Sequence, residues 1–93
     1  MITDFFNNET EKVWQGHASR RLPSTMQSVA RRKLRMLNAA RTLDDLRIPP
    51  ANRLEALKHD RKGQHSIRIN DQWRICFVLN DGNAGRVEIC DYH

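Results

Sequence analysis

The sequence contains few residues of the types that would assign it to several familiar classes. Two of its 93 residues are cysteine and six are aromatic, which is too few aromatic residues for a base-stacking platform of the usual single-strand-binding kind. No apolar run approaches the roughly 20 residues that a membrane-spanning helix needs. The first six residues include an acid and no base, unlike the start of a signal peptide. We therefore expect a cytoplasmic protein with no membrane partner.

Groups of metal ligands are also missing. Cys76 and Cys90 form no CxxC or Cys/His cluster, and the four histidines have no metal-ligand spacing. We interpret the two cysteines as buried free thiols, because disulfides are uncommon in cytoplasmic proteins. We expect neither a metal ion nor another cofactor.

One long segment has no acidic residue. The chain carries 16 Lys and Arg against 11 Asp and Glu, and residues 17–41 hold seven of these bases and no acid. Concentrated positive charge attracts polyanions over about a Debye length, so nucleic acid is the expected partner. A solvated helix face would have the same composition, and the charge count alone does not separate the two interpretations.

The length allows one domain, residues 1–93, and the periodicity within it changes half-way. Ser24 and Gln27 have capping-box spacing directly after Pro23, and apolar residues then recur at helical spacing as far as Ala40. The apolar arc of this helix includes Lys33, whose amine we expect to extend outward to water. The opposite side is basic and carries Arg31, Arg32 and Arg35.

The second half of the chain alternates with the period of strands. Asp81-Gly82 is a strong hairpin signal between two such segments. A short helix opened by Asn8 and one helical turn at residues 43–46 complete the pattern, which indicates an α+β fold with helices on one face of an antiparallel sheet. The predicted strands cover residues 2–6, 53–57, 66–69, 73–79 and 86–92.

Four segments together resemble a known family. Residues 52–58 read NRLEALK, 60–63 DRKG, 66–75 SIRINDQWRI and 87–93 VEICDYH. In combination they closely resemble the HigB-type toxins of bacterial toxin–antitoxin modules, within the RelE/ParE-like superfamily. The resemblance covers residues 52–93 with specific motifs and extends less specifically to the basic helix.

The resemblance implies a compact RelE-like domain and a ribosome-dependent endoribonuclease that cuts messenger RNA. It also implies a HigA-type antitoxin with a helix-turn-helix domain, so operator DNA would be contacted only through that partner. Cleavage by 2′-hydroxyl attack needs proton transfer and stabilisation of negative charge at the phosphate. The residues that match these needs are Lys58, Arg74, Asp91, Tyr92 and His93, with Arg61 and Arg68 beside them as RNA-binding candidates.

Each of these residues also has an ordinary structural interpretation. Lys58 is either an ammonium at the scissile phosphate or a solvated lysine at a strand end. Arg74 is either a phosphate clamp or a solvent-facing strand residue. The end of the chain supplies a carboxylate, a phenol and an imidazole, or is a frayed polar tail. Asp91 and His93 are both candidates for the proton transfers, and Tyr92 for orienting a nucleotide.

Two positions depart from the family pattern. His59 follows Lys58 where close relatives often have glycine, so the turn is strained if it requires a positive φ. Glu55 stands where some HigB toxins have histidine. A non-catalytic inhibitor of the same fold, ParE-like and directed at another target, or a regulatory partner of the antitoxin, remains the alternative.

Overall fold

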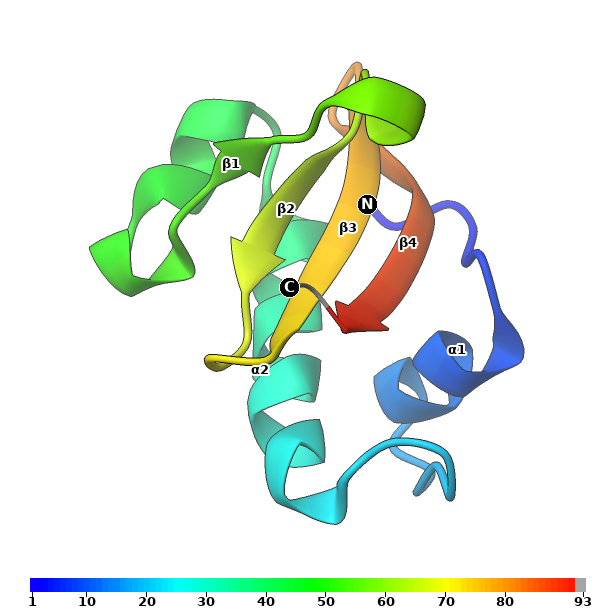
Figure 1. Ribbon diagram of the computed structural model, residues 1–93. Coiled ribbons are helices and arrows are strands. Elements are labelled where there is room, and N and C mark those ends of the chain that lie inside the picture. Colours follow the sequence, from blue (N-terminus) through cyan, green and yellow to red (C-terminus); the bar gives the residue numbers. More distant parts are fainter. Residues whose placement is uncertain (92–93) are drawn as a thin grey trace.

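Two helices pack behind a four-stranded antiparallel sheet with strand order β1-β2-β3-β4 (Figure 1). The computed structural model describes residues 1–91, so the expectations for Tyr92 and His93 lie outside the described residues. The α+β prediction is confirmed. The helices are α1 (Asn8–Trp14) and α2 (Ser24–Ala39), with 3-10 helices η1 (Leu43–Arg47), η2 (Pro50–Asn52) and η3 (His59–Arg61). The strands are β1 (Glu55–Ala56), β2 (His65–Arg68), β3 (Trp73–Asn80) and β4 (Asn83–Asp91).

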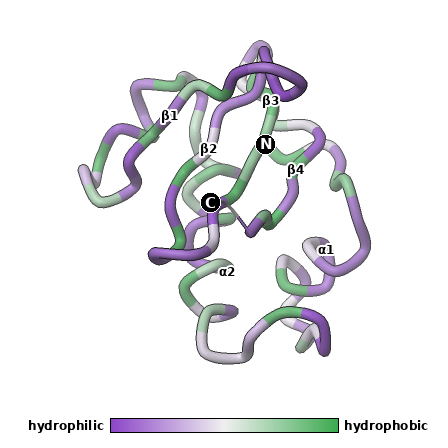
Figure 2. The backbone as a smooth tube through the Cα atoms, in the orientation of Figure 1, coloured by the Kyte–Doolittle hydropathy of each residue, from purple (hydrophilic) through white to green (hydrophobic). Residues whose placement is uncertain are grey.

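The core lies between α2 and one face of the sheet. Ile75 and Phe77 of β3 are completely buried there, together with Leu34 and Leu37 of α2. Alternation along β3 directs Arg74 and Cys76 to the other face, as the sequence predicts. Figure 2 shows the contrast, because the tube is hydrophilic throughout η3 and its flanking turn, residues 58–62.

The turn between β3 and β4 is the predicted two-residue hairpin loop. Asp81 has a φ of 51° and Gly82 a φ of 78°, which is the left-handed geometry of a type I′ turn. A Cβ at Gly82 would approach nothing closer than 3.7 Å. The requirement for glycine is therefore conformational and not steric.

Gly82→Ala is expected to lower the free energy of unfolding by about 1 kcal/mol, because alanine disfavours positive φ. Denaturant unfolding of the parent and the variant measures this difference. Asp81→Asn is the matched control, since asparagine tolerates left-handed backbone. An unchanged stability in Gly82→Ala would show that the turn adopts another geometry.

Both helix starts differ from the predictions. Asn7, one residue earlier than predicted, caps α1, and its Oδ1 accepts the amide N–H of Thr10 at 2.9 Å. The α2 N-cap is Pro23, with no side-chain cap. The predicted capping box does not form there because the Gln27 amide bonds to the preceding loop.

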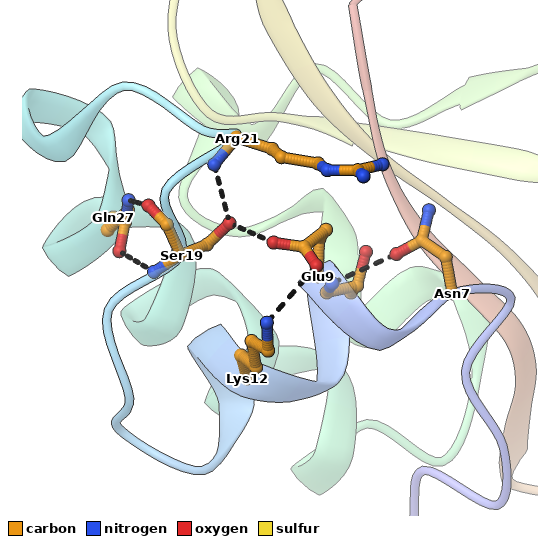
Figure 3. A network of polar contacts seen from close by, with 7 residues as sticks. Asn7, Glu9, Lys12, Ser19, Arg21 and Gln27 are labelled. Carbon is orange, nitrogen blue, oxygen red and sulfur yellow. Dashed lines mark hydrogen bonds and ion pairs between the residues drawn. The ribbon is translucent and has the colours of Figure 1, made fainter.

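Ser19 ties that loop to both helices (Figure 3). Its Oγ donates to Glu9 at 2.5 Å, and its backbone exchanges two hydrogen bonds with the Gln27 side chain. The bond from Ser19 is the main reason that the pKa of Glu9 is lowered. The basic segment between the helices is therefore held in place, and Arg21 N–H contributes by donating to Ser19 Oγ at 3.3 Å.

The predicted strands at residues 2–6 and 53–57 are much reduced. Residues 2–6 make only two isolated parallel bridges to β4, Ile2 with Ala84 and Phe5 with Val87. Of residues 53–57, only Glu55–Ala56 is a strand. Arg53 has a φ of 46°, a left-handed conformation that a strand cannot accommodate.

Lys33 does not extend to water as predicted. Its side chain is buried within α2's apolar arc and its Nζ donates to Oδ1 of Asn52, a completely buried side chain. Asn52 Nδ2 in turn donates to the backbone oxygens of Leu46 and Ile48 at 3.2 and 3.4 Å. The pair therefore fastens the irregular connection at residues 43–53 to α2.

Candidate functional site

The sheet face opposite α2 gathers polar and charged side chains, and we call it the polar face. Directly paired residues on neighbouring strands project to the same face. The register pairs Glu55, Ser66, Cys76 and Glu88 in one row across the four strands. A second row contains Arg68, Arg74 and Cys90.

Arg74 is buried at the centre of the polar face, with 9% of its surface exposed. Its Nε donates to Ser66 Oγ at 2.7 Å, and its Nη2 donates to the Arg53 carbonyl at 2.5 Å. Glu55 lies 3.7 Å from Nη2. The guanidinium is therefore fixed by protein groups, unlike the solvent-facing residue of the structural interpretation.

Two arginines stand side by side on this face. Arg68 pairs directly with Arg74 across β2 and β3, as its predicted place on that surface requires. Like charges directly opposite one another repel. Asp71 forms an ion pair with Arg68 and Glu55 one with Arg74, which offsets that repulsion. The region therefore has a compensated but concentrated positive charge.

Lys58 follows a residue that is anchored to the polar face. Leu57 packs against Cys76 and Cys90, and its N–H donates to the Gln64 carbonyl at 2.9 Å. Lys58 itself is exposed, and its ammonium has no hydrogen bond or ion pair to residues 1–91. Its backbone caps η3. The structure therefore places a cation without a protein partner at the edge of the face that carries Arg74.

His59 adopts the conformation that its replacement of glycine made a concern. Its φ is 59°, in the left-handed region. Histidine is one of the non-glycine residues enriched there, so the turn retains its shape at some cost in backbone strain. The departure at His59 therefore leaves the Lys58 turn intact.

Arg61 joins η3 to β4. Its Nη1 lies 3.1 Å from Glu88 Oε1 and 3.1 Å from Gln64 Oε1. Burial alone would lower the pKa of Arg61, but the hydrogen bond to Glu88 outweighs it and the pKa is raised. Arg61 is thus a clamp on the Lys58 turn in this structure, besides being a predicted RNA-binding residue.

The two cysteines are buried free thiols, as predicted. A hydrogen bond between them lowers the pKa of Cys76 and, together with burial, raises the pKa of Cys90. They form the apolar floor on which Leu57 packs. In the part of the chain that the structure describes, no three His, Cys, Asp or Glu residues converge as a metal site.

Asp91 occupies the end of β4. Its register partner is Trp73, so alternation assigns it to the face of Trp73 and not to that of Arg74. Its side chain is exposed and accepts a hydrogen bond from Gln72 Nε2 at 3.1 Å. The structure thus gathers the Lys58 turn, Arg61, Arg68 and Arg74 around the polar face and places Asp91 at a strand end nearby in sequence.

The arginines of α2 belong to a different surface. Arg32 and Arg35 are exposed, while Arg31 is half-buried with its guanidinium over Gly16. Because α2 packs behind the sheet, the structure does not bring these three residues to the polar face (Figure 1). Among the described residues, no helix is long and apolar enough to cross a membrane.

Two residues that hold the site were not predicted from the sequence. Ser66 receives Arg74 Nε, and Asn52 fixes the segment whose Arg53 carbonyl receives Arg74 Nη2. Ser66 alternates with Ile67 and pairs with Cys76, so the strand pattern offered a weak signal for it. Nothing in the sequence around Asn52 indicates that its amide is buried.

Comparison with known proteins agrees with this geometry. Residues 3–93 match the family described as "RelE-like toxin of type II toxin-antitoxin system HigB". The chain belongs to the HigB family of toxins. Toxin HigB-1 of Vibrio cholerae serotype O1 is 41% identical to this HigB-family chain over 85 residues, 90% of each protein. An uncharacterized protein of Haemophilus influenzae is 40% identical over 72 residues, 77% of this chain and 71% of that protein.

Solved structures show the same RelE-like fold. The YoeB-YefM complex from Staphylococcus aureus contains a chain that matches all of this HigB-family chain with a TM-score of 0.62 and 18% identity, over 95% of its own length. A heterotetrameric YoeB-YefM toxin–antitoxin complex from the same organism gives a TM-score of 0.61 at 18% identity, with the same coverage. The protein is thus a toxin of a type II toxin–antitoxin system, and the recognition from residues 52–93 is confirmed.

Proposed function

We propose that this toxin is an endoribonuclease that depends on the ribosome and cuts translated messenger RNA. The observation that carries the proposal is the Arg74 guanidinium, which is buried and fixed on the polar face beside the Lys58 turn. A binding protein has no need to hold a cation in this way, whereas phosphoryl chemistry gains from charge that is already oriented.

The proposed reaction is a transesterification without a metal ion. A base removes the 2′-hydroxyl proton, and the oxygen attacks the adjacent phosphorus. The bond to the 5′-oxygen breaks, that oxygen takes a proton, and a 2′,3′-cyclic phosphate remains. Lys58 and Arg74 stabilise the charge on the phosphate, Asp91 and His93 transfer the protons, and Tyr92 orients a nucleotide.

The ribosome supplies what an isolated toxin of this size lacks. Weak cleavage of free RNA is expected, because in-line attack needs a message held in an extended geometry and orientation alone is worth many orders of magnitude in rate. The target places the action of the toxin in the cytoplasm.

The proposed neutralising partner is a HigA-type antitoxin with a helix-turn-helix domain. The similar solved chains come from complexes titled as toxin–antitoxin assemblies, which supports a partner of this class. Operator DNA is then contacted through the antitoxin. The simplest test is whether a small adjacent reading frame encodes such a protein and protects cells from the toxin.

Mapping of RNA 5′ ends during induced expression tests the nuclease proposal. New ends within translated messages, absent when initiation is blocked, are expected. Asp91→Ala and removal of His93 should each reduce these ends at equal protein levels. Growth inhibition without new ends would instead favour the non-catalytic inhibitor.

The basic surface of α2 is proposed to dock on ribosomal RNA. Replacing Arg31, Arg32 and Arg35 by glutamine is expected to weaken ribosome binding and to flatten its salt dependence by about 0.7–0.9 log units per lost phosphate contact. Co-sedimentation with ribosomes across a salt series measures both. Neutralising Lys12, Arg41 and Arg47 removes the same charge elsewhere, and an equal effect there would refute a defined docking surface.

A further inference from the structure

A cavity of 220 Å³ lies at the β4 edge of the polar face. It is smaller than the roughly 300–1,000 Å³ of typical small-molecule sites. It therefore accommodates one planar ring system and not a complete cofactor. Its lining residues are Phe6, Asp60, Arg61, Gln64, Arg86 and Glu88.

Phe6 presents an aromatic ring at this cavity. The residue is 57% exposed, although burial would be favourable for so large an apolar side chain. Its backbone is fixed, because its N–H donates to the Val87 carbonyl at 2.9 Å. A fixed, exposed ring beside cations is the arrangement on which nucleic-acid bases stack.

Arg86 reaches the cavity from a strained position. A β-bulge shifts the register of β3 and β4 between Cys76 and Val78, and Arg86 has a φ of 51° within it. Glycine would relieve that strain. Its backbone N–H is held by Asp4 Oδ2 at 3.1 Å, so the bulge stays fixed while it carries a guanidinium.

The cavity has unused hydrogen-bonding groups of both kinds. The Arg61 and Glu88 side chains engage each other. In contrast, neither the Asp60 carboxylate nor the Arg86 guanidinium has a hydrogen bond or ion pair within residues 1–91. The site therefore offers an acceptor, a set of donors and an aromatic face to a ligand.

We propose that this cavity is a nucleobase subsite that prefers guanine in the message next to the cut. The inference rests on the proposed nuclease function. Guanine presents N1–H and N2–H₂ donors to a carboxylate and O6 and N7 acceptors to a guanidinium, whereas adenine lacks the two-donor edge. The stacking contribution of Phe6 is independent of the base.

The subsite and the cleavage site share one turn. Lys58 is the N-cap of η3, and Asp60 and Arg61 lie within η3. The Arg61–Glu88 ion pair fixes that helix to β4. A base bound at Asp60 therefore positions its own backbone phosphate close to the Lys58 turn.

Cleavage of messages with randomised codons in a reconstituted translation system tests the subsite. The expected result for the full-length parent is guanine enrichment at one position beside the cut. Asp60→Asn should reduce the enrichment about tenfold, and Phe6→Ala should slow cutting at all bases alike. Asp44→Asn, an exposed carboxylate in η1, is the matched control and should change neither.

Arg86→Gly separates the subsite from the fold. It removes strain and a guanidinium together, so the variant should unfold at higher denaturant concentration while losing guanine preference. Cuts without guanine enrichment, or with enrichment unaffected by Asp60→Asn, would overturn the subsite and leave the nuclease intact.

A parent chain that makes no cuts would overturn the proposed function itself. Titration of the purified chain with guanosine monophosphate, followed by amide NMR, then decides the subsite alone. Shifts at Gly85 and Glu88 that Asp60→Asn abolishes support it, and their absence in the parent refutes it.

Discussion

Lys58→Ala is expected to cut translated messages at least about 100-fold more slowly than the parent, with an unchanged free energy of unfolding. Removal of one group that stabilises developing charge typically costs this much in rate. The side chain is exposed and contacts no protein partner within residues 1–91, so the loss is confined to the site. Alanine keeps the backbone carbonyl that receives the Arg61 N–H at 3.2 Å.

Lys62→Ala provides the control for this experiment. Lys62 is an exposed lysine at the other end of η3, so its replacement removes the same charge from the same turn. We expect a loss of a few-fold at most, since a distant exposed charge is screened by salt. Equal losses in the two variants would show that only the overall charge of the turn matters. Undiminished cutting by Lys58→Ala would remove Lys58 from the site.

Asn52→Ala is expected to lower the free energy of unfolding by about 3 kcal/mol. Its side chain is completely buried, and it accepts from Lys33 Nζ while donating to two backbone carbonyls. Removal leaves a buried ammonium without its partner and two carbonyls without a donor, and both omissions are costly. Urea unfolding measures the loss.

The pH dependence of that loss identifies its cause. Burial lowers the pKa of Lys33, and Arg32 and Arg68 lower it further. Because the folded-state pKa lies below the unfolded value of about 10.4, the unfolded chain binds more protons between the two, and stability rises with pH there. Without Asn52 the pKa falls further, so the deficit of Asn52→Ala should be smaller near pH 10 than near pH 7.

The same substitution in a Lys33→Met background serves as the control. Methionine cannot titrate, so the deficit from Asn52→Ala should there be independent of pH. A pH-independent deficit in the parent background as well would mean that the lost volume, and not the buried ammonium, sets the cost.

Short-range pattern was enough to predict the framework of the site. Helical spacing located α2, alternation located β3 and the face of Arg74, and Asp81-Gly82 located the turn. Each of these depends on residues that are neighbours in the chain. The family motifs then indicated the chemistry, at residues that periodicity alone leaves ambiguous.

Long-range packing decided what the pattern could not. Alternation assigns Arg74 to a face, but its burial depends on Ser66 and on the Arg53 carbonyl, which is 21 residues away. Lys33 turns inward because Asn52, 19 residues away in a proline-rich connection, supplies an acceptor. A sequence read locally has no means of pairing such residues.

The bridges between residues 2–6 and β4 have a consequence for the time at which a new copy becomes complete. Thr3 and Ala84 are hydrogen-bonded although 81 positions separate them. At about 5–20 residues per second, a ribosome needs roughly 4 to 16 seconds to make that intervening stretch. Throughout this interval Phe6 has no strand beside it, and β4, with Glu88 and Cys90, does not yet exist. A nascent toxin is therefore unfinished until nearly all of its chain has been synthesised, which gives a co-translated partner time to reach it.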